Sequence, residues 1–180
     1  MGFILDILIL FALVGGILWC MRRALVRTLL GILTLFLATL FSALLYTPII
    51  NWFSSVSGKS ASGYSAGSIV FGGLLIIFDV ILEFTLHRNY PDLRLKRLKT
   101  WDHILGAIAG IVWATFAVCL ALVILDFAGR SFGGDVPFLN QLVGQSGLVP
   151  GFREFFKLPL LGIRPLFPQG LPAVLANFAH

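Results

Sequence analysis

The segment Ile104–Leu125, ILGAIAGIVWATFAVCLALVIL, decides the class of protein to which this chain belongs. It holds 22 consecutive residues without a charged side chain. About 20 such residues cross the ~30 Å hydrocarbon core of a bilayer. Because backbone polar groups in lipid must be satisfied within the segment itself, a run of this length predicts a transmembrane helix.

Three further segments are similar in length and composition. Phe3–Met21 holds 19 residues with one charge, and Thr28–Tyr46 is an uncharged run of 19. The third, about Ser68–Leu86, carries two carboxylates. Together the four segments predict an all-α membrane protein, with four transmembrane helices in residues 1–127 and an apolar, proline-rich tail over residues 128–180.

The composition excludes most other classes of protein. Hydrophobic residues make up 58% of the 180 residues and charged residues 12%, whereas a soluble domain has roughly 25% charged residues. A soluble enzyme, a disordered tail, a disulfide scaffold and a nucleic-acid binder are therefore not expected. The isoelectric point of about 9.7 is better explained by basic residues at the edges of membrane spans. Cys20 and Cys119 lie in apolar runs and are expected to be packing residues.

Basic residues near the ends of the spans predict the orientation. The first and third connecting segments carry eight of them, whereas the second segment and the start of the tail carry two. This bias places the first and third segments in the cytoplasm and both termini outside, which in a bacterium is the periplasm. The eight are Arg22, Arg23, Arg27, Arg88, Arg94, Lys96, Arg97 and Lys99, and the two are Lys59 and Arg130.

The connecting segments differ in texture. Asn51–Gly67 is rich in Ser and Gly, which is typical of a flexible connector. In His87–Trp101, apolar residues recur every third position among basic ones, which suits a short helix on the anionic cytoplasmic leaflet. The alternative is a topology signal with no further role. The expected membrane-surface contacts are Arg94, Lys96, Arg97, Lys99 and Trp101.

The tail, Ala128–His180, is apolar but is not expected to span the membrane. Six prolines interrupt it before any stretch reaches ~20 residues. Within it, Gly151–Lys157 places Phe152, Phe155 and Phe156 on one helical face. This pattern predicts a helix that rests on the outer membrane surface or covers the mouth of the bundle, with a contact surface for a periplasmic partner as the alternative.

Asp79 and Glu83 are the most informative polar residues. They stand four apart and therefore share one face of the third helix, with Asp79 near the bilayer centre. A charge at that depth costs ~2.5–3.5 kcal/mol, so it must face protein or water. Two interpretations stay open. The pair is a proton or cation relay, or Asp79 is neutral and hydrogen-bonded between helices while Glu83 reaches Arg88 or Arg27.

Other residues are assigned structural roles. Gly106 and Gly110 form a GxxxG motif, which lets helix backbones approach closely. The neighbouring helix belongs to the same chain or to a second copy, so a homo-oligomer is open. Asp6 and Asp126 lie near the outer ends of their helices, and Asp6 is expected to cap its own helix, where the macrodipole favours negative charge.

Motifs of enzymes are missing from the sequence. There is no HExxH, GxSxG, P-loop or GxGxxG fingerprint. His87 and His103 lack a metal-ligand spacing and are expected to contact lipid headgroups. No catalytic residue, cofactor or metal site is therefore expected.

Several short motifs together resemble a known family. They are an Asp near the start of the first helix, a Gly and Arg segment after it, the run Trp101-Asp102-His103-Ile104-Leu105-Gly106 with Gly110, and Ser146-Gly147-Leu148-Val149-Pro150. The resemblance is to the bacterial colicin V production family, small inner-membrane proteins with four helices. The family-like positions outside the two quoted runs are Asp6, Gly15 or Gly16, Arg22 and Arg27. The departures from the family's preferences are Arg23 for Gly, Thr28 for Glu, His103 for Arg and Trp113 for a second Arg.

The resemblance implies a function without naming a catalytic residue. It implies a non-catalytic inner-membrane protein that supports toxin production or export, or envelope homeostasis, with an export or envelope protein as partner. The alternative function is a small proton-coupled transporter or channel that uses Asp79.

Overall fold

The computed structural model describes residues 2–23, 25–57, 64–89, 99–131, 137–167 and 170–179. All the regular structure in these ranges is helical. Four helices are long: α1 (Gly2–Arg23), α2 (Leu25–Ser57), α3 (Tyr64–Asn89) and α4 (Lys99–Ser131). Each is long and apolar enough to cross a membrane, so the chain is a multi-pass membrane protein. Each predicted span lies within one of these helices.

The long helices extend further than the apolar runs that predicted them. At 1.5 Å per residue, the 33 residues of α2 cover about 50 Å, which exceeds the hydrocarbon core. The second connecting segment was predicted to be a flexible connector over Asn51–Gly67, and this is wrong at both of its ends. Within this part of α2, the hydroxyls of Ser54 and Ser55 donate hydrogen bonds to the carbonyl oxygens of Asn51 and Trp52, so the helix itself supplies their acceptors.

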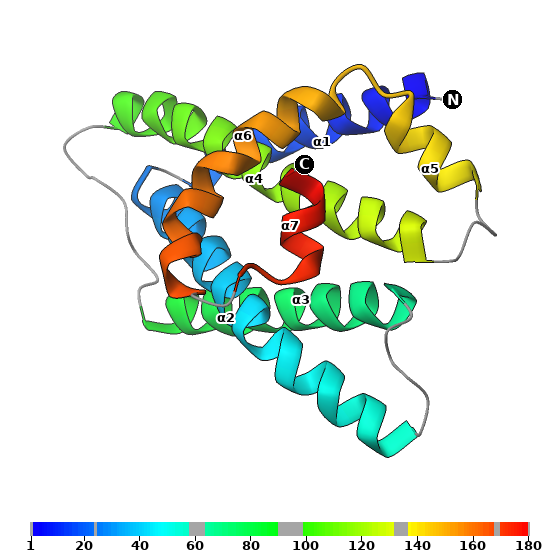
Figure 1. Cartoon of the computed structure of the whole chain (residues 1–180). Helices are drawn as coiled ribbons and strands as arrows, with labels where there is room; N and C mark the ends of the chain where they lie inside the picture. Colours follow the sequence, from blue (N-terminus) through cyan, green and yellow to red (C-terminus); the bar gives the residue numbers. More distant parts are fainter. Residues whose placement is uncertain are drawn as a thin grey trace.

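Helix α4 is the centre of the bundle. It contacts α1, α2 and α3, and also the three helices of the tail. Its buried side chains include Phe116, Cys119 and Val123. Both cysteines are free and buried, as expected of packing residues. Consecutive long helices run in opposite directions (Figure 1). Helices α1 and α3 end at the same end of the bundle at which α2 and α4 begin.

The tail folds back along the bundle. It forms α5 (Pro137–Gly144), α6 (Val149–Ile163), a 3₁₀ turn (Arg164–Leu166) and α7 (Ala173–Ala179). In Figure 1, α6 crosses in front of α4, and α7 lies between α4 and α3. Because Val174, Leu175 and Phe178 of α7 are buried, the last described helix is part of the core.

The apolar face of α6 packs on the rest of the chain. Phe152 and Phe156 are buried against the bundle, which agrees with the predicted helix that covers the bundle. The Cys119 thiol lies 3.4 Å from the Phe152 carbonyl oxygen, and the Phe156 ring lies 6.4 Å from that of Phe116. Phe155 is half-buried. The reason is that α4 offers a long apolar surface beside which a 15-residue helix buries its own apolar face.

A polar contact accompanies this packing. Asp126, near the end of α4, is buried, and its carboxylate lies 3.5 Å from the guanidinium of Arg153 on α6. The same guanidinium lies 5.5 Å from the centre of the Phe178 ring on α7. Arg153 therefore links three helices, because its charge is matched by the carboxylate and its flat group covers an aromatic ring.

Candidate functional site

One face of α3 carries titratable side chains in three successive turns. Asp79, Glu83 and His87 are spaced by four residues, so the helix brings them onto one side. All three line a groove of about 360 Å³, with Arg27 of α2 opposite them. The groove also has an apolar wall of exposed side chains, Val80 and Phe84. A mixed surface of this kind admits water or small polar groups beside lipid-facing residues.

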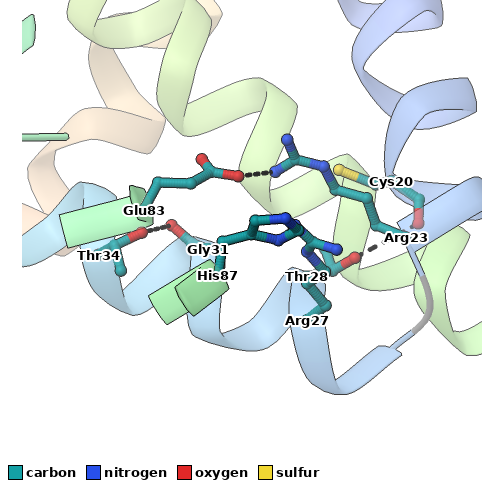
Figure 2. Close-up of polar contacts among 8 residues, drawn as sticks. All are labelled: Cys20, Arg23, Arg27, Thr28, Gly31, Thr34, Glu83 and His87. Carbon is teal, nitrogen blue, oxygen red and sulfur yellow. Dashed lines mark hydrogen bonds and ion pairs between the residues drawn. The ribbon is translucent and has the colours of Figure 1, made fainter. Parts of the chain in front are cut away.

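Glu83 forms an ion pair with Arg23, the last residue of α1 (Figure 2). The sequence had suggested Arg88 or Arg27 as its partner. Arg23 takes that place from the end of α1. Its guanidinium also lies 5.0 Å from the centre of the Trp19 ring. Both partners are partly exposed, with relative side-chain accessibilities of 23% and 31%. A pair of this exposure contributes at most about 1 kcal/mol of stability.

His87 contacts Arg27 of α2, whereas the sequence predicted only a contact with lipid headgroups. One guanidinium nitrogen of Arg27 lies 2.7 Å from Nδ1 of His87, and Figure 2 shows the two side chains side by side. A guanidinium has only donors, so Nδ1 is the acceptor in this contact. This contact requires the tautomer of His87 that carries its proton on Nε2. Its spacing from Glu83 was visible in the sequence and is the signal that could have identified it.

Asp79 differs from its neighbours in the groove. It is half-buried and makes no hydrogen bond or ion pair within the described part of the chain. The charges of Arg23 and Glu83 both act on it. The interhelical hydrogen bond proposed for Asp79 from the sequence is therefore not among the described contacts.

The glycines of the GxxxG motif lie at the contact of α4 with α1. A β-carbon added at Gly110 would lie 2.6 Å from Cβ of Cys20, and one added at Gly16 would lie 2.9 Å from Cβ of Ala114. Gly106 is also buried. The neighbour of Gly110, which the sequence left open, is thus a helix of the same chain. Small residues on both helices let the two backbones approach closely.

The predicted membrane-surface residues are mostly outside these contacts. Arg94, Lys96 and Arg97 lie outside the described residues, and Lys99 and Trp101 belong to the first turn of α4. No group of three His, Cys, Asp or Glu among the described residues could hold a metal ion.

Comparison with known proteins decides the family. The family described as colicin V production protein matches residues 5–155. The chain belongs to this family. Searches of curated proteins and of solved structures find no significant match. The match to the colicin V production family includes all of the groove and all four long helices, and it ends within α6.

Two of the positions that resembled the colicin V production family hold the turn between α1 and α2. The buried carboxylate of Asp102 accepts a hydrogen bond of 3.0 Å from the Leu25 amide, the first residue of α2. Nδ1 of His103 lies 2.9 Å from the Met21 carbonyl oxygen near the end of α1. A carbonyl only accepts, so His103 is the donor. His103 was predicted to contact a lipid headgroup, but it contacts the Met21 carbonyl oxygen. The arginine that the family prefers at this position is also a hydrogen-bond donor.

Asp6 binds the start of another helix. Its carboxylate accepts a hydrogen bond of 2.5 Å from the Ser146 hydroxyl and longer ones from the amides of Gly147 and Leu148. The Ser146 hydroxyl in turn accepts a bond of 3.3 Å from the Val149 amide. Asp6 was predicted to cap its own helix, and this is wrong. It lies beyond the first turn of α1, and the unsatisfied amides at the start of α6 are the better donors.

Two motifs of the colicin V production family thus meet in space. Asp6 and the Ser146–Pro150 run lie 140 residues apart in sequence, yet their side chains are hydrogen-bonded. Gly2 completes the contact, because a β-carbon there would overlap the Gln145 carbonyl. The remaining family-like position, Arg22, is exposed at the end of α1.

Proposed function

We propose that this chain is a non-catalytic component of a bacterial inner membrane that supports toxin production or export, or envelope homeostasis. The family match over residues 5–155 carries the proposal, because it covers the whole four-helix scaffold and not one motif. The polar contacts of Asp102, His103 and Asp6 support a scaffold role, since each joins segments that are distant in the sequence.

Complementation tests this function. In a toxin-secreting bacterium that lacks its own family member, expression of this chain should restore toxin in the medium. Membrane abundance is followed by immunoblot, and the empty vector and a Gly110→Leu chain, in which packing is disturbed, serve as controls. A chain that accumulates normally in the membrane without restoring secretion would contradict the proposal.

The partner is proposed to be an export or envelope protein. A pull-down of the tagged chain from solubilised membranes, with identification of co-purifying proteins by mass spectrometry, tests this. A dedicated export or envelope protein should be enriched over a tagged, unrelated four-helix protein. Recovery of the chain alone would contradict a partner-dependent scaffold.

A second function is favoured by one observation, the Asp79 carboxyl that has no hydrogen bond or ion pair among the described residues. It suits proton-coupled transport, in which Asp79 takes up and releases a proton. Asp79→Asn keeps size and hydrogen-bonding capacity but cannot titrate. If Asp79 is a proton carrier, this variant should reach normal abundance and lose function. A fully functional Asp79→Asn variant excludes a proton-carrier role for Asp79. If Asp79 contributes to the structure, the Asp79→Leu variant should be less abundant in the membrane.

A further inference from the structure

His87 stands at the mouth of the groove that leads to Asp79. Along α3, the order from the end of the helix inward is His87, Glu83 and Asp79, and consecutive members are about 6 Å apart along the axis. The contact of Arg27 with His87 is exposed, whereas Asp79 is half-buried. The groove therefore runs from an exposed pair at the end of the bundle to a free carboxyl in its interior.

On the far side of Asp79, the next two turns of the same face of α3 are apolar, up to the buried Ser68. One turn further along α3, Leu75 is buried, and Phe71 is fully buried. Gly72 is also buried, and a β-carbon there would contact Ile124 of α4. The titratable side chains of the groove thus end at Asp79, with packed apolar side chains next to it on α3.

The contact at the mouth depends on the charge of His87. Neutral His87 accepts from Arg27 through Nδ1. A proton taken up from water converts the imidazole to imidazolium, in which both ring nitrogens are donors. The acceptor for Arg27 is then lost and two positive charges face each other, so the Arg27 side chain must move away. Histidine changes its charge between pH 5 and 8, which makes such a step accessible.

The charged and titratable groups around the groove come from three helices. Helix α3 contributes Asp79, Glu83 and His87, and α2 contributes Arg27. Helix α1 contributes Arg23, paired with Glu83, and the buried thiol of Cys20 nearby (Figure 2). The described acid and base of α4 at this end, Asp102 and His103, are engaged with the backbone of the α1–α2 turn.

We propose that Asp79, Glu83 and His87 form a one-sided proton-access groove, and that protonation of His87 opens its mouth by releasing Arg27. The proposal deepens, and rests on, the second function given above. A proton passes from imidazolium to the Glu83 carboxylate and then to the Asp79 carboxylate, directly or through water. Each donor returns to its starting form, so His87 is neutral again after the transfer.

Thiol labelling tests the opening of the groove. Asp79→Cys is treated in membrane vesicles with a charged methanethiosulfonate added at the end that carries the α1–α2 turn. Its labelling rate is divided by that of Arg88→Cys, an exposed site at the same end, which corrects for thiol chemistry. This ratio should rise about fivefold or more from pH 8 to pH 6, the range in which histidine gains its charge. The unmodified chain, whose two cysteines are buried, gives the background.

A second substitution separates the role of His87 from a general effect of pH. Asp79→Cys combined with His87→Gln should show a low, pH-independent ratio, because the glutamine amide oxygen accepts from Arg27 at every pH. The matched control is His103→Gln, which removes the other described histidine at this end and should leave the rise intact. If Asp79→Cys does not fold, Val80→Cys, also in the groove wall, replaces it.

A ratio that stays flat with pH, or a rise that persists in the His87→Gln chain, overturns the proposal. Its failure is distinguishable from failure of the second function, because labelling measures access to the groove and the Asp79→Asn phenotype measures the use of Asp79 in cells. Equal labelling from both sides of the membrane also overturns it, since the groove would then be open at both ends.

Discussion

At the residue scale, the turn between α1 and α2 depends on side chains from α4. Asp102 accepts from the Leu25 amide, and His103 donates to the Met21 carbonyl. The first amides and last carbonyls of a helix have no partner within that helix. Two adjacent residues of α4 therefore satisfy one group at the start of α2 and one at the end of α1. This fixes the position of Arg23 and Arg27, which supply the positive charges of the groove.

Asp102→Ala should destabilise the protein by about 1 kcal/mol, the usual effect of losing a side-chain cap. Asp102→Asn should be close to the unchanged protein, because its amide oxygen still accepts from Leu25. Thermal unfolding in detergent, followed by circular dichroism, measures both. Equal melting temperatures for the Ala and Asn variants would show that the hydrogen bond at Leu25 does not contribute.

At the element scale, α6 illustrates how a helix too short to cross the membrane is fixed within the protein. Its start binds Asp6 of α1, and Arg153 in its second turn reaches Asp126 of α4. Its apolar face is buried by contacts such as that of Phe156 with Phe116. Polar contacts at one end and apolar packing along the length together define where α6 lies.

Asp6→Ala should release the start of α6. Removing the carboxylate leaves the Ser146 hydroxyl and the amides of Gly147 and Leu148 without this acceptor. The expected results are faster limited proteolysis at residues 145–148 and a lower melting temperature. The control is Glu154→Ala, which removes a carboxylate that contacts only exposed Lys157. Identical proteolysis of the two variants would contradict an anchoring role for Asp6.

The contact of α1 with α4 depends on the absence of side chains. Gly110→Ala should lower stability, because the new β-carbon would lie 2.6 Å from Cβ of Cys20. Gly73→Ala is the control, since nothing lies within 4 Å of its added β-carbon. Alanine favours a helix over glycine by about 1 kcal/mol, so this control should be neutral or stabilising. The measurement is the melting temperature in detergent. Similar shifts in both variants would refute close approach at Gly110.

At the scale of the whole molecule, the sequence predicted the crossings but not the pairings. The four spans follow from runs of about 20 apolar residues. Such runs form helices in lipid, because their backbone polar groups must be satisfied within the segment. The contact of Asp6 with Ser146 links residues 140 positions apart, and no local pattern encodes such a distance. Likewise, the prolines of the tail excluded a span but did not indicate that α6 and α7 would pack on α4. The spacing of Asp79 and Glu83 did predict a shared face, whereas their partners depend on how the turn places Arg23 and Arg27.

The orientation of the whole molecule follows from charge and is testable on exposed positions. The eight-to-two bias of basic residues predicts that the α1–α2 turn and the end of α3 are cytoplasmic and that the end of α2 is periplasmic. Cys20 and Cys119 are buried, so a single added cysteine reports its own side. Ser55→Cys, at the exposed end of α2, should react with an impermeant maleimide in spheroplasts. Arg88→Cys, exposed at the end of α3, should react only after lysis. The reverse labelling pattern would show that the protein has the opposite orientation in the membrane, with the mouth of the groove in the periplasm.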